Sequence, residues 1–419
     1  MHQIIRGCLI GVVVKLACMA GLAAQELKLP VELTVAAGQR DRSDALVEFA
    51  LPKANAVGPA MRLVETTGGK TAPVATQVDS QAGRLWWIAE GTTAAGAKRT
   101  YRLEAGAAAK APEIAIVDSE RTVEARYGDK PLLRYNKAHV EPPPGVNPRY
   151  GRSAHLHPVW TPGGAIVTDE LPPDHLHQSG IFLAYTKTAF EGRDVDFWNL
   201  AGGKGRVRFK ELKGGASGPV FGQILALHEH VDLTAPENGT EIGAQIGGKV
   251  ALVETWDVRI WNVGWKSGYW LLDITSRVRC AGDSPLRLPE YHYGGMAIRA
   301  ARPWTPQHVR FFTSEGDDRI KDNHTRPRWC DVSGPIDGQP AGITIMTHPS
   351  NFRFPEPLRI HPTMPYLVYT PSFLGDWEIR PAAAHESHYR FVIHDGELTA
   401  QAIERLWRDY AEPLVATGG

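Results

Sequence analysis

The segment TVEARYGDKPLLRYNKAHV, residues 122–140, shows how most of this chain is expected to fold. Polar and apolar residues partly alternate on both sides of GDK, which is typical of two antiparallel strands joined by a turn. The same β-branched and aromatic pattern recurs through later segments. These are VRFKELKGG (207–215), FGQILALHEHVDL (221–233), VALVETWDVRIW (250–261), YWLLDITSRVRC (269–280) and GITIMTHPSNF (342–352).

The chain also needs many loops, because it contains 42 glycines and 31 prolines, well above ordinary use. Only LTAQAIERLWRDYAEP, residues 398–413, spaces its apolar residues as a helix does, and Pro413 ends it. We therefore predict an all-β protein. A large antiparallel β-sandwich with long loops would occupy residues 120–415 and carry a short C-terminal helix.

Residues 26–115 have a different sequence pattern, which predicts a small, separate β-sandwich. Short, partly alternating segments are separated there by Gly, Ala, Asp and Pro. The segments are VELTVAA (31–37), LVEFALP (46–52), RLWWIAEG (84–91) and KRTYRLEAG (98–106). No cluster of titratable residues stands out among them, so we expect an accessory domain without catalytic residues.

The first 24 residues predict a signal peptide. A short positive start, MHQIIRG, precedes the apolar run CLIGVVVKLACMAGLAA, and Ala23 and Ala24 suit cleavage. The protein is therefore expected in the periplasm or outside the cell, with an uncleaved anchor as the alternative. Cleavage would leave Cys280 and Cys330, for which a disulfide and two buried thiols are both consistent with the sequence.

The overall charge argues against two classes of partner. Acidic and basic residues balance at 46 each, whereas nucleic acid and acidic membranes favour a basic surface. The chain has no P-loop, no GxGxxG after a strand and no GxSxG elbow, so no nucleotide cofactor is expected. We expect a small-molecule or oligosaccharide substrate, and no membrane contact beyond the signal segment.

Histidines separated by one residue are unusually frequent. Residues i and i+2 of a strand project from the same face, so this spacing aims two imidazoles at one point. Sixteen histidines placed at random in this chain would give about one such pair or fewer. Three pairs occur: His155/His157, His175/His177 and His228/His230. The last pair falls within a regular strand, where a structural or surface role is favoured.

The stretch DELPPDHLHQSGIFLAY, residues 169–185, contains the second pair beside an aspartate. One interpretation is that His155, His157, His175 and His177 line one pocket, with Asp174 as a ligand or orienting group. Such a set would bind one divalent ion, such as zinc, iron, manganese or nickel. The alternatives are acid–base catalysis without a metal and hydrogen bonding within a constrained loop.

Two further segments are candidates for substrate binding or catalysis. DVDFWNL (194–200) places Trp198 and Asn199 beside aspartates, which suits a sugar ring or, alternatively, a core aromatic pair. LPEYHYGGMAIRA (288–300) supplies Glu290, His292 and Arg299 near two glycines. Glu290 or His292 would serve as a general acid or base there, and a solvent-facing salt pair is the alternative.

Polar residues after or within predicted strands complete the candidate set. THPSNFRFPEP (347–357) supplies His348, Asn351 and Arg353, and this arginine can clamp a carboxylate or phosphate. The alternative is a loop anchored by backbone hydrogen bonds. Glu254, in VALVETWDVRIW, would complete an acid–base pair if it faces a cleft, or would face water.

Five motifs occur in a fixed order: HPVWTPGGAIVTDELPPDHLHQSGIFLAY (157–185), DFWN (196–199), YGGMAIR (293–299), HPSNFRFP (348–355) and FVIHDGE (391–397). Together they resemble the DUF6807 family of exported bacterial proteins, over about residues 125–412. The family's DHPHHRG-like motif corresponds to Asp174, His175, His177 and Gly180. Leu176 and Gln178–Ser179 replace its usual Pro and His-Arg, which weakens any role that needs the extra His or Arg.

The resemblance implies a β-sandwich, often in a setting of carbohydrate breakdown. Members are often labelled PmoA-like, a name that implies membrane methane oxidation. The sequence argues against that activity, because it has no apolar span of about twenty residues beyond the signal segment.

These observations predict an exported carbohydrate-active enzyme. Asp174, His175 and His177 would bind metal or transfer protons, with Glu254, Glu290 or His292 completing an acid–base pair. Hydrolysis, elimination and epimerisation all use such pairs. A noncatalytic carbohydrate-binding or envelope protein is the first alternative, and a cupin-like metal-dependent oxygenase is the second.

Overall fold

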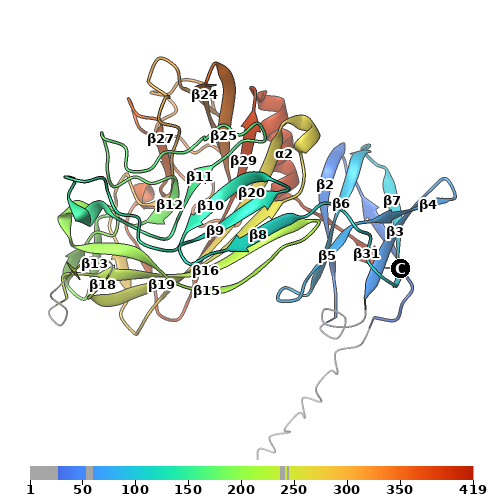
Figure 1. The fold of residues 1–419 in the computed structure, drawn as a ribbon, viewed down its shortest axis with the longest axis horizontal. Coiled ribbons are helices and arrows are strands. Elements are labelled where there is room, and N and C mark those ends of the chain that lie inside the picture. The colour runs from blue at the N-terminus through green and yellow to red at the C-terminus, as the bar shows by residue number, and fades with distance from the viewer. Residues whose placement is uncertain (1–26, 53–59, 236–240, 243–244, 419) are drawn as a thin grey trace, which may run out of the picture.

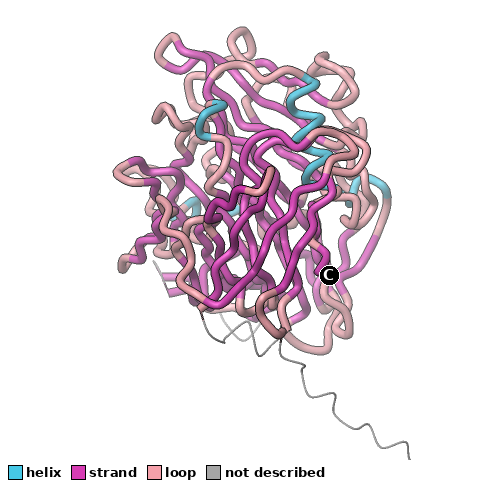
Figure 2. Tube along the Cα trace, turned by 90° about the vertical axis from the view of Figure 1, so that its right-hand side faces the viewer, coloured by secondary structure: helices cyan, strands magenta, loops and turns pink. Residues whose placement is uncertain are grey.

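The computed structural model describes residues 27–52, 60–235, 241–242 and 245–418, which form a small and a large β-domain side by side (Figure 1). The predicted signal segment, 1–24, lies outside the described residues. Strands dominate the described chain (Figure 2), which confirms the all-β prediction. Within these ranges no helix has the length and apolar character needed to cross a membrane.

The small domain consists of two sheets, antiparallel except for the parallel pair of β2 and β30, and they enclose their own core, which includes the fully buried Trp87 and Tyr101. One sheet contains β1 (Val31–Ala36), β3 (Met61–Thr67), β4 (Lys70–Val74), β7 (Lys98–Ala105) and β31 (Thr417–Gly418). The other contains β2 (Arg42–Ala50), β5 (Thr76–Asp79), β6 (Arg84–Thr93) and β30 (Leu414–Val415). Both sheets therefore include a strand from the C-terminal end of the described chain. That contribution was not predicted from the sequence.

The large domain is a sandwich of two eight-stranded antiparallel sheets, which we call the front and back sheets. The front sheet has the order β26-β27-β22-β12-β11-β10-β9-β8, and the back sheet β15-β16-β19-β20-β29-β25-β24-β23. The front strands are β8 (Ile114–Asp118), β9 (Thr122–Tyr127), β10 (Lys130–Asn136), β11 (His155–Val159), β12 (Ile181–Ala184), β22 (Gly295–Arg299), β26 (Leu358–Ile360) and β27 (Tyr366–Tyr369).

The back sheet contains the longest strands of the described chain. Its eight strands are β15 (Gly205–Ala216), β16 (Phe221–Asp232), β19 (Lys249–Trp261), β20 (Tyr269–Cys280), β23 (Arg310–Thr313), β24 (Trp329–Ile336), β25 (Gln339–Thr347) and β29 (His385–Asp395). Two small sheets accompany it. They are formed by β13 (Thr188–Phe190), β14 (Arg193–Val195), β21 (Leu286–Leu288) and β28 (Trp377–Ile379), and by β17 (Glu241–Ile242) and β18 (Gln245–Ile246).

Strand register decides which residues of the front sheet face the sandwich interior. Tyr135, Leu156, Ile181, Ile298 and Leu367 pair across five strands in one row, and all are fully buried. The row points inward, because the Tyr135 hydroxyl lies 2.7 Å from His228 Nε2 of the back sheet. Side chains alternate along a strand, so the adjacent row faces outward. That outer row contains Asn136, His155, Phe182, Ala297, Val368 and Arg359.

The predicted C-terminal helix is confirmed as α2 (Ala400–Ala411), which joins the two domains. Thr399 caps it by accepting a hydrogen bond from Ala402 N. Near its end, Asp409 pairs with Arg42 of the small domain at 2.7 Å. The indoles of Trp86 and Trp261 pack at a tilt of 56° with centroids 5.1 Å apart and add an apolar contact between the domains.

Cys280 and Cys330 are both buried free thiols. The large domain therefore relies on packing rather than on a disulfide between these two residues. Burial raises the pKa of the Cys330 thiol well above its ordinary value, so this thiol stays protonated and unreactive.

Candidate functional site

The outer face of the front sheet carries the predicted histidine motifs, and the stretch 169–180 crosses it. Asp169 N donates to Arg299 O of β22 at 3.0 Å, and Gly180 N donates to Asp169 O at 2.7 Å. Gly180 has a positive φ of 53°, and a Cβ there would lie 2.0 Å from the Leu156 carbonyl oxygen. Only glycine fits this close approach, which holds the stretch against β11 and β22.

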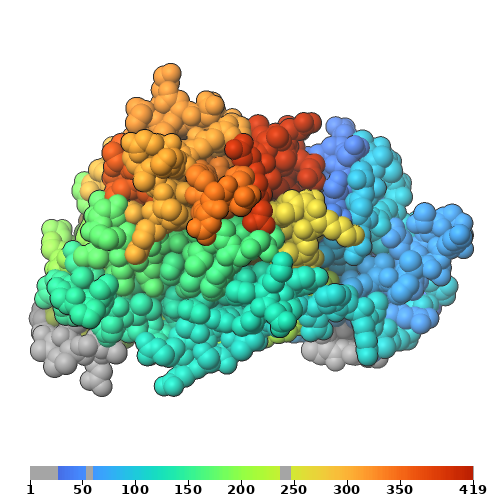
Figure 3. Space-filling model, turned by 45° about the horizontal axis from the view of Figure 1, so that its top comes forward, coloured from blue at the N-terminus to red at the C-terminus, as the bar shows by residue number. Residues whose placement is uncertain are grey.

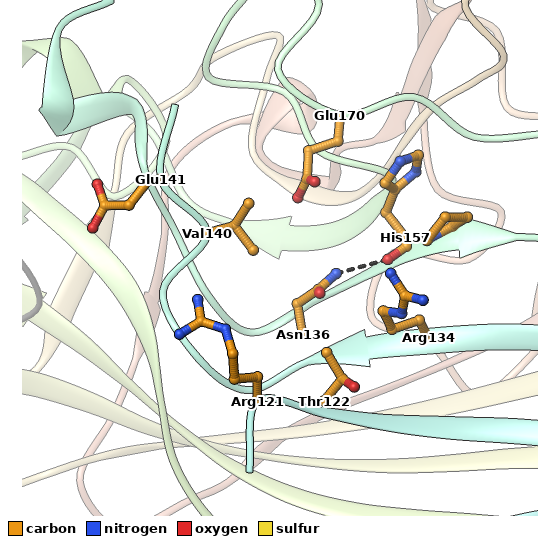
Figure 4. Close-up of a pocket in the computed structure, with 9 residues that line it drawn as sticks. Arg121, Thr122, Arg134, Asn136, Val140, Glu141, His157 and Glu170 are labelled. Carbon is orange, nitrogen blue, oxygen red and sulfur yellow. Dashed lines mark hydrogen bonds between the residues drawn. The ribbon is translucent and has the colours of Figure 1, made fainter. Parts of the chain in front are cut away.

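A cavity of about 410 Å³ lies on one side of this stretch (Figure 4). Glu170 and His157 reach it from different segments, and Asn136 lies between them, with its side-chain amide donating to the His157 carbonyl at 2.7 Å. Behind the cavity, the fully buried His155 hydrogen-bonds through Nε2 to Glu170 Oε1. The remaining lining residues are Arg121, Thr122, Arg134, Val140, Glu141 and Pro158.

Two ionisable groups of this cavity have shifted pKa values. Burial lowers the pKa of His157 to about 4, so its imidazole is neutral at pH 7. Burial alone would raise the pKa of Glu170, but the adjacent His155 lowers it below its ordinary value. The cavity therefore presents a carboxylate and a neutral imidazole at neutral pH, a combination suited to moving a proton.

Hydrogen bonds also orient the His157 ring. Its Nδ1 lies 2.9 Å from Thr168 Oγ1, and that hydroxyl oxygen accepts the backbone N–H of Val159 at 3.1 Å. The hydroxyl proton of Thr168 is thus free to go to Nδ1, which places the imidazole proton on Nε2. In this tautomer His157 offers an N–H donor and Glu170 offers the base.

A second group of histidines includes two residues of the stretch itself. The ring of His175 is 5.5 Å from that of His177 and 5.7 Å from that of His361, between ring centroids. We call these three residues the histidine cluster. Asp174 accepts from Arg299 Nη2 through both carboxylate oxygens, at 3.0 and 3.2 Å, which fixes the start of the DHLH segment.

Partly buried rings continue the outer face beyond the histidine cluster. Arg359 lies over the Tyr293 ring at 5.4 Å, and His292 follows at 4.6 Å from Tyr293. His324 comes next, 6.3 Å from His292, and stacks on Phe373 at 4.2 Å. In the space-filling view, the green segments around residues 150–180 lie directly against the orange segments that follow residue 300 (Figure 3).

A family model described as "Family of unknown function (DUF6807)" matches residues 122–408. The chain belongs to the DUF6807 family. The matched region contains the cavity, the histidine cluster and most of both eight-stranded sheets, which confirms the predicted resemblance.

Among solved structures, an alpha-mannosidase from Enterococcus faecalis V583 is similar with a TM-score of 0.45 and 11% sequence identity. The similarity covers 93% of this chain and 46% of that chain, so the DUF6807 protein spans about half of its length. The search of curated proteins gave no match.

The four histidines of the proposed metal site do not converge in the DUF6807 domain. His155 bonds to Glu170 and His157 to Thr168, whereas the ring of His175 contacts those of His177 and His361. In the described ranges, no group of three or more His, Cys, Asp or Glu residues is arranged to hold a metal ion. The predicted ligand set, which the cupin-like oxygenase interpretation required, is therefore not assembled.

Glu254 lies in the sandwich interior, which corrects its assignment to a cleft. It is fully buried, and its carboxylate contacts His230 at 2.8 Å, Ser276 at 2.5 Å and the Trp256 indole at 2.5 Å. Even residues of β19 face inward, so a substrate on the outer face does not reach it. The structural interpretation of His228 and His230 is confirmed, because both are fully buried beside Glu254.

Trp198 is also unavailable to a sugar, since it is 3% exposed and packs against Phe182 at 4.9 Å. The core interpretation of the DFWN motif is therefore the correct one for its tryptophan. Asn199 is exposed, but its side-chain amide donates to Asp196 at 2.7 Å, and Asp196 also accepts the Trp198 and Asn199 backbone N–H groups. The polar part of the motif is a local turn.

The residues of THPSNFRFPEP lie apart from the histidine cluster. Arg353 donates to the carbonyls of Pro371, Gly375 and Asp376, so it anchors a loop, as the alternative interpretation predicted. Asn351 is buried and bonds to Glu356 and to the backbone of His388. His348 contacts His388 and Tyr410 beside α2.

Of the remaining candidates, His292 and Arg299 lie on the outer face, whereas the exposed Glu290 lies at its margin. The backbone of Glu290 bonds to Asp376 and Lys187. Glu170, Asn136, His361, Arg152 and Arg359 were missed. Glu170 could have been found, because it stands next to Asp169 within the stretch already singled out. The others carry no local signal, since only tertiary contacts bring them together.

Proposed function

We propose that this DUF6807 protein is an exported carbohydrate-active enzyme whose sugar or glycoside substrate binds on the outer face of the front sheet. The single observation that carries the proposal is the cavity of about 410 Å³ that Glu170 and His157 share. Its volume lies within the usual range for small-molecule sites. Its carboxylate, imidazole, amide and hydroxyl groups match the alternating donors and acceptors of a sugar ring.

In this proposal Glu170 is the general base and His157 Nε2–H is the hydrogen-bond donor to a substrate oxygen. His155 holds Glu170 in place, and Thr168 holds His157. Such a pair abstracts a proton from a carbon or hydroxyl while stabilising the oxygen that gains charge, as epimerisation, elimination and hydrolysis all require. Asp174 does not take this role, because Arg299 occupies both of its oxygens.

The histidine cluster would then bind the part of the substrate that extends past the crossing stretch. Burial lowers the pKa of His177 and that of His361 to about 4, so both rings are neutral donors and acceptors at pH 7. Neutral imidazoles suit sugar hydroxyls, which both give and receive hydrogen bonds.

The test is turnover of a panel of glycosides and oligosaccharides, followed by NMR, with the wild type and two variants. Glu170→Gln should lose turnover by about 100-fold or more, because an amide cannot accept the proton. Glu141→Gln is the matched control, since Glu141 lines the same cavity but is exposed and away from His157 (Figure 4). Full activity of a folded Glu170→Gln variant would refute the catalytic assignment.

Noncatalytic carbohydrate binding is the second candidate, and the partly exposed rings of Tyr293, His292 and Phe373 favour it. Sugars stack on such rings without being converted. Binding of panel sugars by wild-type protein with no product would select this candidate over the enzyme.

A further inference from the structure

Positive charge exceeds negative charge around the histidine cluster. Four arginines, at positions 152, 299, 319 and 359, act on the pKa values of the cluster, whereas the carboxylates that do so are Asp174 and Asp196. Arg299 is neutralised by its ion pair with Asp174. The other three arginines make no ion pair with a carboxylate in the described chain.

Two of these arginines bond only to neutral oxygens. Arg319 donates through Nε to His361 O at 2.7 Å and through Nη2 to Met364 O. Arg359 donates through Nη1 to Ile360 O at 2.7 Å and to Asn323 Oδ1 at 3.1 Å. These bonds fix the guanidinium groups beside His361 but leave their charges uncompensated.

Arg152 is the strongest case, because it is 3% exposed and its guanidinium has no hydrogen bond or ion pair to any described residue. It lies 4.6 Å from the Phe182 ring on the outer face. Its charge lowers the pKa of both Glu170 and His177, so it acts on the cavity and the histidine cluster together.

Burying a charge without a partner is costly, and proteins ordinarily pair buried arginines with carboxylates. Burial lowers the pKa of Arg152 and that of Arg319 to about 10, whereas Arg302, which pairs with Asp169, has a raised pKa. Asp196 and Glu170 supply further negative charge, since Asp196 acts on His177 and Glu170 acts on Arg152. Two carboxylates against the three arginines without an ion pair still leave an excess of positive charge.

We propose that the face formed by Arg152, Arg359 and the histidine cluster binds the oxyanion of an acidic sugar. Guanidinium groups match carboxylate and sulfate oxygens in geometry as well as charge, and imidazole N–H groups add further donors. The substrate class would then be a glycan with uronic-acid or sulfated units. This inference rests on the proposed function, because it specifies the kind of sugar that occupies the same sheet face.

The experiment is calorimetric titration of the full-length mature protein with oligosaccharides matched in length: uronate-containing, sulfated and neutral. Wild type should bind at least one acidic series about tenfold more tightly than the neutral series, and added salt should reduce that preference. Arg359→Gln should remove the preference, so that the acidic series binds about as weakly as the neutral series. Arg310→Gln, an exposed arginine on the back sheet, is the control.

Arg359 is chosen because it is only partly buried, whereas replacement of Arg152 risks misfolding. Arg152→Lys serves as a second variant that keeps the charge but loses the planar fork, and it should weaken acidic binding. Equal binding of acidic and neutral series, or no acidic binding at all, overturns the inference. So does an unchanged preference in Arg359→Gln.

The titrations with uronate-containing and with sulfated oligosaccharides identify which oxyanion the face binds. Failure of this inference is also separable from failure of the proposed function. If the protein converts neutral sugars and this turnover depends on Glu170, the proposed enzyme function stands and the specificity for acidic sugars is refuted. If Glu170→Gln remains fully active and acidic oligosaccharides still bind, the specificity for acidic sugars stands and Glu170 is not the base.

Discussion

Two histidine pairs with the same HxH spacing lie in opposite environments in the large domain. His228 and His230 point into the sandwich, where both are fully buried and share the Glu254 carboxylate. His175 and His177 lie on the outer face, partly exposed, with their ring centroids 5.5 Å apart. An HxH pair therefore does not specify whether its imidazoles lie in a closed interior or on an open face.

The difference lies in how the charged groups are satisfied. Burial alone would raise the pKa of Glu254, yet His228 and His230 hold it well below its ordinary value, so the interior network keeps a charge that is bonded on several sides. On the outer face of the front sheet, Arg152 carries a buried charge without a hydrogen-bond or ion-pair partner among the described residues. Satisfied polar groups stabilise a fold, whereas unsatisfied ones remain available to a ligand.

Removing the centre of the interior network should have the largest effect on stability. Glu254→Ala leaves two buried histidines, a serine and an indole without their acceptor, and should cost about 3–5 kcal/mol of unfolding free energy. Urea denaturation measures the loss. Glu211→Gln, at an exposed ion pair with Lys213 on the same sheet, should stay within about 0.5 kcal/mol of wild type. A small change in Glu254→Ala would remove the distinction between the two faces.

A second buried carboxyl, Glu356, should behave in the opposite way from Glu254. Burial raises its pKa to about 7, although Asn351 and Tyr389 donate to it. Between pH 4.5 and 7 the unfolded chain ionises this group while the folded protein keeps it protonated, so stability falls as the pH rises. Glu356→Gln should therefore be more stable than wild type at pH 8, by up to about 3 kcal/mol.

The gain from Glu356→Gln should vanish near pH 4, where the wild-type carboxyl is protonated in both states. Thermal melts at pH 4 and pH 8 separate this effect from a general packing change. The exposed Glu397→Gln variant should show no such pH dependence. An equal shift at both pH values would contradict the raised pKa.

Replacing one outer histidine should give a smaller effect that depends on pH with the opposite sign. Burial, His175 and Arg152 lower the pKa of His177 to about 4, below its unfolded value of 6.5. Between these values the unfolded chain binds the proton and the folded protein does not, so stability is lost as the pH falls. His177→Asn should lose less stability than wild type between pH 6.5 and 4, as measured by urea midpoints. The exposed His308→Asn is the control.

The smallest effect on stability is expected for His175→Ala, because this ring is only partly buried and no side-chain hydrogen bond fixes it. Its melting temperature should stay within a few degrees of wild type, while sugar binding or turnover is lost. His228→Ala, the interior counterpart, should melt clearly lower. Equal melting shifts in the two variants would show that both histidines are structural.

The strands and the C-terminal helix could be predicted from sequence because their patterns are local. Alternation placed β9, β10 and the long back-sheet strands correctly, and apolar spacing with Pro413 placed α2. The site could be predicted only in part. Asp174, His175, His177 and Arg299 meet, yet Glu254 points inward and Trp198 is buried, because alternation does not reveal which face another layer covers.

The pairing of His155 with Glu170 shows the second limit. The two residues are separated by a loop whose path depends on Gly180 passing under the Leu156 carbonyl and on backbone bonds to β22. The path of such a loop is set by tertiary contacts rather than by local preferences, so no periodic pattern in the sequence predicts it.

The two C-terminal strands have a consequence for how this chain is made. β31 pairs with β1, and β30 lies parallel to β2, so the small domain gains its edge strands from the end of the described chain (Figure 1). A ribosome delivers these strands only after the whole large domain has been synthesised. The first domain to emerge is thus the last to be finished. The small domain can be completed only after the large domain between its strands has been translated, and its two sheets then join both ends of the described chain.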